Sequence, residues 1–158
     1  GENLGTDILY SGTVSAAIEA MILGVPAIAV SLAEQENPDY RFTANFLRRF
    51  LRIFDEYNLP KNTLLNINIP GKNHREIAGV AITRLGLRLY RNAFEKRVDP
   101  RGRNYYWLAG KAVDDVDQEA KDTDIAAINN AYISITPLHF DLTNYPLIKK
   151  LQEIKWEV

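Results

Sequence analysis

The strongest candidate for chemistry lies near the start of the chain, where a glycine-containing loop leads into a helix. Residues 11–23 repeat apolar side chains at helical spacing, and Ser11 or Thr13 can cap the first turn. Such a helix end presents unpaired N–H groups that suit an anion, and Gly12 would let a phosphate approach the main chain. The same two hydroxyls could instead only cap the helix. No Gly-Lys-Ser/Thr follows, so this is not a Walker loop.

Other titratable residues are weaker candidates. His139 stands two positions before Asp141, a pair that could do acid–base chemistry, although we favour a structural hydrogen bond. The only other histidine, His74, is too distant in sequence to define a metal site with it. The chain has no cysteine, which excludes a thiolate metal site and a cysteine nucleophile.

Two segments of opposite charge follow one another in the second half of the chain. Residues 84–103 contain seven basic and two acidic residues with aromatic side chains among them. Residues 114–124 contain six acidic residues and one lysine. Basic and aromatic residues together can bind nucleic acid, but we favour complementary arms within or between subunits. The acidic run lacks the glycine and glutamate that an EF-hand needs at its sixth and twelfth positions, so calcium is not expected.

The elements that must position these residues alternate in type through the first half. The pattern predicts a helix at 11–23, a buried strand at 27–32, a helix from Asn37 and Pro38 to before Pro60, and a strand at 64–69. The second helix has an apolar face, and its members are Phe42, Phe46, Phe50, Ile53, Phe54 and Tyr57. This order predicts an α/β fold.

The second half predicts smaller elements. We expect strands at 80–90 and 104–108 to form a hairpin, then a short helix at 123–130 and a strand from 131 that ends at Pro137. A terminal helix at 146–156 should turn Leu147, Ile148, Leu151 and Ile154 inward. We therefore divide the chain into a core at 1–80 and an extension at 81–158.

Composition limits the classes of protein. The 158 residues are 46% hydrophobic and 25% charged with a net charge of −1, as in an ordinary globular domain and not a disordered chain. The apolar stretch at 16–32 is too interrupted to cross a membrane, and no basic leader precedes it. The chain opens on a polar glycine loop, so we expect it to be the C-terminal part of a longer protein. The lack of cysteine fits a cytoplasmic location.

Several motifs resemble the SurE family of survival proteins, which are 5′/3′-nucleotidases. The matching segments are NLGTD at 3–7, YSGTV at 10–14, AAIE at 16–19, GVPAIAVSL at 24–32, LNINIP at 65–70, DPRG at 99–102, YW at 106–107, TD at 123–124, YISITPL at 132–138 and DLT at 141–143. Their order makes the resemblance specific, and it covers essentially the whole chain.

The resemblance implies a three-layer, Rossmann-like α/β core with a β-hairpin extension and a C-terminal helix used in a homodimer or homotetramer. It also implies a phosphatase that hydrolyses nucleoside 5′- and 3′-monophosphates with Mg²⁺ or Mn²⁺. We expect the hairpin and residues 133–143 to contact a partner subunit. No membrane partner is expected, and nucleic acid is not favoured.

The resemblance also implies where the catalytic groups lie. The family's metal ligands are an aspartate pair in Asp-Asp-Gly, a serine, and an asparagine in Ser-Gly-Ile-Asn, and none of these motifs is present here. Asn3 matches a later asparagine, and the ligand itself would precede Gly1. We therefore expect the catalytic and metal residues upstream, and hypothesise that Asn3, Ser11, Gly12 and Thr13 hold the substrate phosphate. The alternative is a non-catalytic oligomerisation or binding module.

Overall fold

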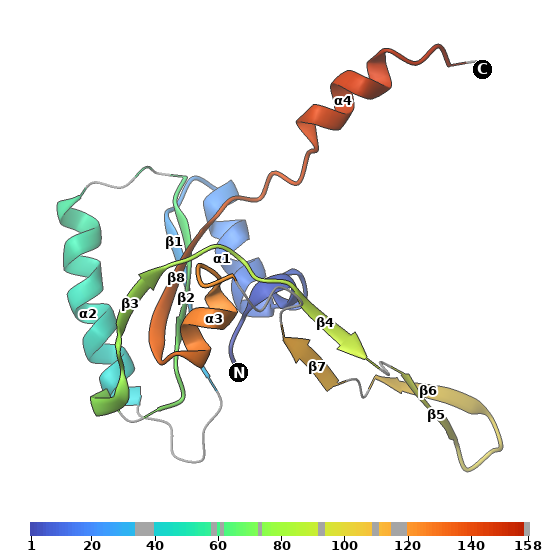
Figure 1. Ribbon diagram of the computed structural model, residues 1–158, viewed down its shortest axis with the longest axis horizontal. Coiled ribbons are helices and arrows are strands. Elements are labelled where there is room, and N and C mark those ends of the chain that lie inside the picture. The colour runs from blue at the N-terminus through green and yellow to red at the C-terminus, as the bar shows by residue number, and fades with distance from the viewer. Residues whose placement is uncertain are drawn as a thin grey trace.

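The computed structural model describes residues 1–33, 40–57, 60, 62–72, 74–91, 94–108, 111–114 and 120–156. Its centre is a mixed sheet in the order β1-β2-β8-β3 (Figure 1). The strands β1 (Ala27–Leu32) and β2 (Leu64–Ile69) are parallel. The strand β8 (Tyr132–Leu138) runs antiparallel to β2 and parallel to β3 (Gly79–Ile82). A strand from late in the sequence therefore lies inside the sheet, next to β2.

One face of the sheet is covered by α1 (Gly12–Ile22), as the helical spacing predicts. Val14, Ala17 and Met21 of this helix pack against small residues of β1 and against Leu64. The small side chains let the helix lie close to the strands. Gly24 ends the helix with φ of +80°, a conformation that L side chains rarely adopt.

The opposite face is covered by α2 (Tyr40–Glu56). Four phenylalanines spaced four residues apart pack on the isoleucines of β2 and β8, namely Phe42, Phe46, Phe50 and Phe54. Ile53 and Tyr57 do not belong to this face as predicted, because they are 51% and 72% exposed. The contact consists of this i, i+4 row and the adjacent Leu47, and Ile53 and Tyr57 lie outside it. The predicted helix start at Asn37 and Pro38 lies outside the described residues.

The predicted hairpin strands differ from those observed. Residues 80–90 divide into β3, which joins the main sheet, and β4 (Arg88–Arg91), which pairs with β7 (Lys111–Asp114). The strand β6 (Asn104–Leu108) pairs instead with β5 (Phe94–Val98) across a tight turn at Asp99. The resulting arm points away from the sheet (Figure 1). Sequence pattern alone missed the break at residues 83–87 because apolar residues continue through it.

The last elements are α3 (Asp124–Asn129), β8 and α4 (Tyr145–Gln152). Pro137 does not end β8 as predicted, because it still pairs with Leu65. Pairing with β3 has already ended at Ile135, so no neighbour on that side needs the missing N–H group.

The terminal helix does not turn its apolar side chains inward as predicted. Figure 1 shows α4 extending away from the sheet. The predicted inward residues Leu147, Ile148, Leu151 and Ile154 are 45%, 39%, 40% and 49% exposed. No helix of the described residues has the length and apolar character needed to cross a membrane.

Candidate functional site

A layer of buried polar residues lies on the α1 side of the sheet, near the carboxyl ends of β1 and β2. Residues of a strand alternate between faces, and Leu65, Ile67 and Ile69 face α2. Asn66 and Asn68 therefore face the other way, yet both are fully buried. In open α/β sheets, ligands bind in the crevice at the carboxyl ends of the strands. The buried asparagines mark this edge as the place to look for a site.

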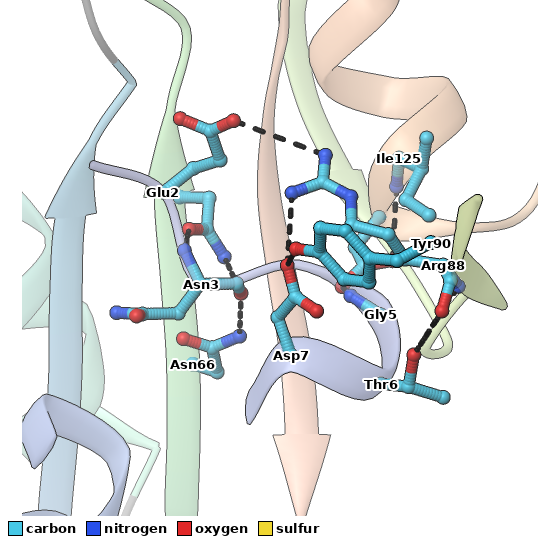
Figure 2. Close-up of polar contacts among 11 residues, drawn as sticks. Glu2, Asn3, Gly5, Thr6, Asp7, Asn66, Arg88, Tyr90 and Ile125 are labelled. Atoms are coloured by element: carbon cyan, nitrogen blue, oxygen red, sulfur yellow. Dashed lines mark hydrogen bonds and ion pairs between the residues drawn. The ribbon is translucent and has the colours of Figure 1, made fainter. Parts of the chain in front are cut away.

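Asn3 is held on this layer by hydrogen bonds to its main chain. Its N–H group donates to Asn68 Oδ1 at 2.8 Å, and its carbonyl accepts from the amides of Asn66 and Asn68 at 2.8 and 2.9 Å. Its own side-chain amide donates to the Ser31 hydroxyl. Figure 2 shows Asn3 beside Asn66. The predicted site residue Asn3 is thus fixed at the carboxyl edge, and Ser31, Asn66 and Asn68 were not predicted as site residues.

The other predicted site residues form the start of α1. Ser11 is the N-cap of α1, because its Oγ accepts from the Val14 N–H at 3.1 Å. The prediction that Ser11 can cap the helix is therefore confirmed. A serine hydroxyl that accepts in this way still has a proton to donate. Gly12 and Thr13 are exposed, and a Cβ at Gly12 would meet nothing within 4 Å. Gly12 and Thr13 are therefore open to a ligand, whereas Ser11 beside them is buried, with 9% of its surface exposed.

A short 3₁₀ helix, η1 (Gly5–Tyr10), joins these two parts. Its six residues, with Leu4 before them, separate Asn3 from Ser11. The hydrogen bonds of Asn3 go to Ser31 of β1 and to Asn66 and Asn68 of β2, and not to residues 11–13. Phosphate binding by Asn3, Ser11, Gly12 and Thr13 therefore stays a prediction.

The strand β4 anchors η1 from the other side through Arg88. Its guanidinium lies 3.2 Å from Asp7 and 3.8 Å from Glu2 (Figure 2). The Tyr90 hydroxyl donates to the same Asp7 oxygen at 2.6 Å, and this bond raises the pKa of Tyr90. Thr6 Oγ1 donates to the Arg88 carbonyl at 2.7 Å. Sequence reasoning treated Arg88 only as one of a basic segment, whereas here it orders the loop before α1.

The two oppositely charged segments meet at a few places. Arg84 pairs with Asp122 at 2.9 Å, although both side chains are more than half exposed. The backbone pairing of β4 with β7 also joins the two segments. Residues 115–119, which carry much of the acidic run, lie outside the described residues.

The pair His139 and Asp141 does not form the predicted hydrogen bond. The Asp141 carboxylate instead accepts from the Thr143 N–H at 2.8 Å and from the Tyr145 hydroxyl. Hydrogen bonds from Thr143 and then Tyr145 lower the pKa of Asp141 to about 2, and the charge of His139 makes the smallest contribution. The nearest donors along the chain thus engage Asp141, and the pair offers no acid–base site.

Two cavities of about 460 and 480 Å³ share His139 in their walls. The second also contains Leu138, which pairs with Leu64 at the start of β2. Both cavities therefore lie towards the amino end of β2, at the opposite end of the strand from Asn68. None of the four predicted phosphate-binding residues lines either cavity, although Thr6, Ile8 and Leu9 of η1 line the second.

Comparison with known proteins decides the family. The family model described as "Survival protein SurE" matches residues 1–92. The chain belongs to the SurE family. It is 52% identical over 155 residues to the 5′-nucleotidase SurE of Pelotomaculum thermopropionicum, covering 98% of this chain and 58% of that protein. It is 56% identical over 151 residues to the 5′-nucleotidase SurE of Moorella thermoacetica, covering 96% and 57%.

A solved structure of the same family confirms the fold. The crystal structure of the SurE protein from Aquifex aeolicus matches with a TM-score of 0.80 and 41% identity, over 96% of this chain and 60% of that one. The α/β, Rossmann-like architecture predicted from the sequence is therefore confirmed. This SurE chain spans somewhat more than half the length of the relatives that it matches.

The metal ion that SurE resemblance implies can be tested against the residues on this edge. Asn66 Oδ1 is buried and has no hydrogen-bond partner, so one oxygen donor is available there. Mg²⁺ and similar ions are normally bound through carboxylates, and the described residues hold no group of three or more His, Asp or Glu side chains that could bind one. A single neutral amide oxygen does not make a metal site. The described part of this SurE chain does not fit the ion by itself.

Proposed function

We propose that this chain supplies the phosphate-binding side of a nucleotidase site that hydrolyses nucleoside 5′-monophosphates, and also 3′-monophosphates, to nucleoside and phosphate. The observation that carries the proposal is the fixed loop from Asn3 to Ser11, which joins the carboxyl edge of β1 and β2 to the open start of α1. The relatives named 5′-nucleotidase SurE support the activity on 5′-monophosphates.

The chemistry of these residues suits a phosphate dianion. The N–H groups of Gly12 and Thr13 belong to the first turn of α1, where a helix has no internal acceptors for them. The positive end of the helix dipole and the hydroxyls of Ser11 and Thr13 add attraction for negative charge. These groups would hold and orient the phosphate while water displaces the nucleoside oxygen from phosphorus.

The remaining parts of the proposal concern the whole protein. We propose dependence on Mg²⁺ or Mn²⁺, with the ligands upstream, since the described residues hold no group of three or more His, Asp or Glu side chains that could bind the ion. We also propose a homodimer or homotetramer in the cytoplasm. In this assembly residues 1–80, completed by β8 of the main sheet, form the nucleotidase core, and the exposed parts of 81–158 provide subunit contacts.

The proposal is tested in the full-length protein with three variants of the helix start. Ser11→Ala combined with Thr13→Val removes both hydroxyls, and hydrogen bonds to a charged group are worth about 1.5–3 kcal/mol each, so we expect kcat/KM for a nucleoside monophosphate to fall at least about tenfold. Ser11→Asp keeps a capping oxygen but adds negative charge, so it should fold well and still lose activity. Ser15→Ala is the matched control, because Ser15 Oγ donates only to the Ser11 carbonyl.

Each outcome decides between the interpretations. Unchanged kinetics in Ser11→Asp would show that Ser11 only caps the helix. Wild-type hydrolysis that EDTA abolishes and Mg²⁺ or Mn²⁺ restores supports the proposed metal dependence. A wild-type protein that hydrolyses no nucleoside monophosphate with either ion added would reject the nucleotidase in favour of a non-catalytic module.

A further inference from the structure

A buried carboxylate joins the predicted phosphate-binding loop to a distant part of the fold. Asp124, the first residue of α3, is fully buried. Its Oδ2 accepts the Gly5 N–H at 2.8 Å, and its Oδ1 accepts the N–H groups of Gly86 and Ile125 at 2.8 and 2.9 Å. One side chain therefore ties together η1, the segment between β3 and β4, and the start of α3.

The main chains that Asp124 joins are packed against each other. A Cβ at Gly5 would lie 2.6 Å from the carbonyl oxygen of Gly86, and Gly5 has φ of +52°. Neither residue can move independently while both amides are bonded to one carboxylate. The position of Gly5 is therefore set by Asp124 and Gly86, which lie far from it in the sequence.

Gly5 in turn determines where the helix start lies. It is the first residue of η1, and η1 leads directly to Ser11, whose N–H donates to Ile8 O at 3.2 Å. Asn3, two residues earlier, is bonded to Asn66 and Asn68. The loop is thus held at one point by β2 and at a second point by Asp124.

Burying a carboxylate at this point costs free energy, and its hydrogen bonds offset that cost. Loss of solvent raises the pKa of Asp124, while the N–H groups of Gly5, Gly86 and Ile125 act in the opposite direction. Asparagine has nearly the same shape but replaces one acceptor oxygen by an NH₂ group. In that variant, two N–H donors would face each other at Gly5 or at Gly86, and the tie to the loop would be lost.

We propose that Asp124 is a positioning residue for phosphate binding, which holds the loop from Gly5 to Ser11 so that the start of α1 can receive the substrate phosphate. The inference rests on the proposed function, and it assigns a role to a residue that touches no substrate. Displacement of a binding group by about 1 Å can cost up to about 100-fold in rate.

The test compares Asp124→Asn with Thr123→Ala in the full-length protein. Thr123 caps the same helix, because its Oγ1 accepts the Ala126 N–H at 3.1 Å, whereas the Gly5 N–H is bonded to Asp124. Both variants weaken α3, and only the first releases the loop. In Asp124→Asn we expect KM for a nucleoside monophosphate and Ki for inorganic phosphate to rise together by about tenfold or more. In Thr123→Ala, KM and Ki should both stay within about twofold of the wild-type values when they are measured below the melting temperature of the variant.

A measurement on the wild type keeps the inference testable if Asp124→Asn does not fold. Saturating inorganic phosphate should slow hydrogen exchange at the Gly5 and Gly86 amides, because ligand and carboxylate stabilise the same loop position. Exchange at the Ile133 amide, in β8, serves as the reference. Unchanged exchange at Gly5 with phosphate bound, or equal Ki values in the two variants, would overturn the role of Asp124. An inactive wild type would instead reject the proposed function itself.

Discussion

At the scale of single residues, polar groups removed from solvent organise the candidate site. Asn66, Asn68 and Asp124 are all fully buried, and their side chains bond to the main chain of Asn3 or Gly5. Buried polar groups are costly unless they are hydrogen-bonded, so each of these bonds restricts the conformation of the segment it holds. The order of residues 3–11 thus depends on side chains from β2 and α3.

Gly5 and Gly24 both have a positive φ, so the stability lost when each is replaced by alanine can be compared directly. Gly5→Ala combines a left-handed conformation with a Cβ 2.6 Å from Gly86 O, whereas Gly24→Ala, at φ of +80°, meets nothing within 4 Å. We expect Gly24→Ala to lower the free energy of unfolding by about 1 kcal/mol and Gly5→Ala by more than about 2 kcal/mol. Urea unfolding of both variants measures the difference. Equal losses would mean that the loop can withdraw from Gly86 without cost.

At the scale of elements, short-range hydrogen bonds shape the segment between β8 and α4. Asp141 is bonded to Thr143 and Tyr145, and Asn144 caps α4 by accepting the Leu147 N–H at 3.0 Å. These contacts lie within a few residues of each other, and they direct the chain into α4.

The contacts of Asp141 in this segment should depend on pH. The pKa of Asp141 is about 2 in the folded protein, below its ordinary value of 3.8, because Thr143 and then Tyr145 donate to it. Since the folded value is the lower one, the contacts of Asp141 stabilise the segment above pH 3.8 and are lost as the pH falls towards 2. An NMR titration of the Asp141 carboxyl carbon should give that midpoint.

Substitutions identify the cause of this shift. Thr143→Ala keeps the N–H bond to Asp141 but removes the side-chain hydrogen bond of Thr143, which lowers the pKa most, and Tyr145→Phe removes the next largest contribution. Each should therefore move the midpoint up towards the ordinary value, and His139→Gln should move it least. A midpoint near 4 in the wild type would show that the carboxylate does not make these bonds in solution.

At the scale of the whole molecule, the arm and α4 extend from a three-layer core (Figure 1). Apolar side chains remain exposed on both, including Leu147 and Leu151 of α4 and Phe94 and Trp107 of the arm. Exposed apolar surface of this kind is typical of surfaces that bind another protein. It supports the proposal of a homodimer or homotetramer.

The assembly proposal predicts a change in the mass of the particle. Leu147→Asn combined with Leu151→Asn should shift the full-length protein towards monomer at micromolar concentration, because both side chains lose apolar contact with a partner. Lys149→Gln combined with Lys150→Gln, on the same helix, should leave the assembly unchanged. Sedimentation velocity measures both variants. A wild type that is monomeric under these conditions would reject the proposal.

The sequence by itself determined the elements that depend on local pattern. The helix spacing at 11–23, the cap at Ser11 and the strands at 27–32 and 64–69 are local properties, and all are observed. The ordered motifs also pointed to the SurE family and its α/β fold, which the comparisons confirm.

Only the tertiary structure decided which residues become buried and which strands pair. The alternation at 64–69 places Asn66 and Asn68 on one face but says nothing about what covers that face. Asp124 stands at the end of the acidic run at 114–124, whose pattern gives no sign that this carboxylate is buried. Residues 80–90 contribute strands to two different sheets, and the apolar side chains of α4 remain exposed. These outcomes depend on contacts between residues far apart in sequence, such as Gly5 and Asp124, which no local periodicity encodes.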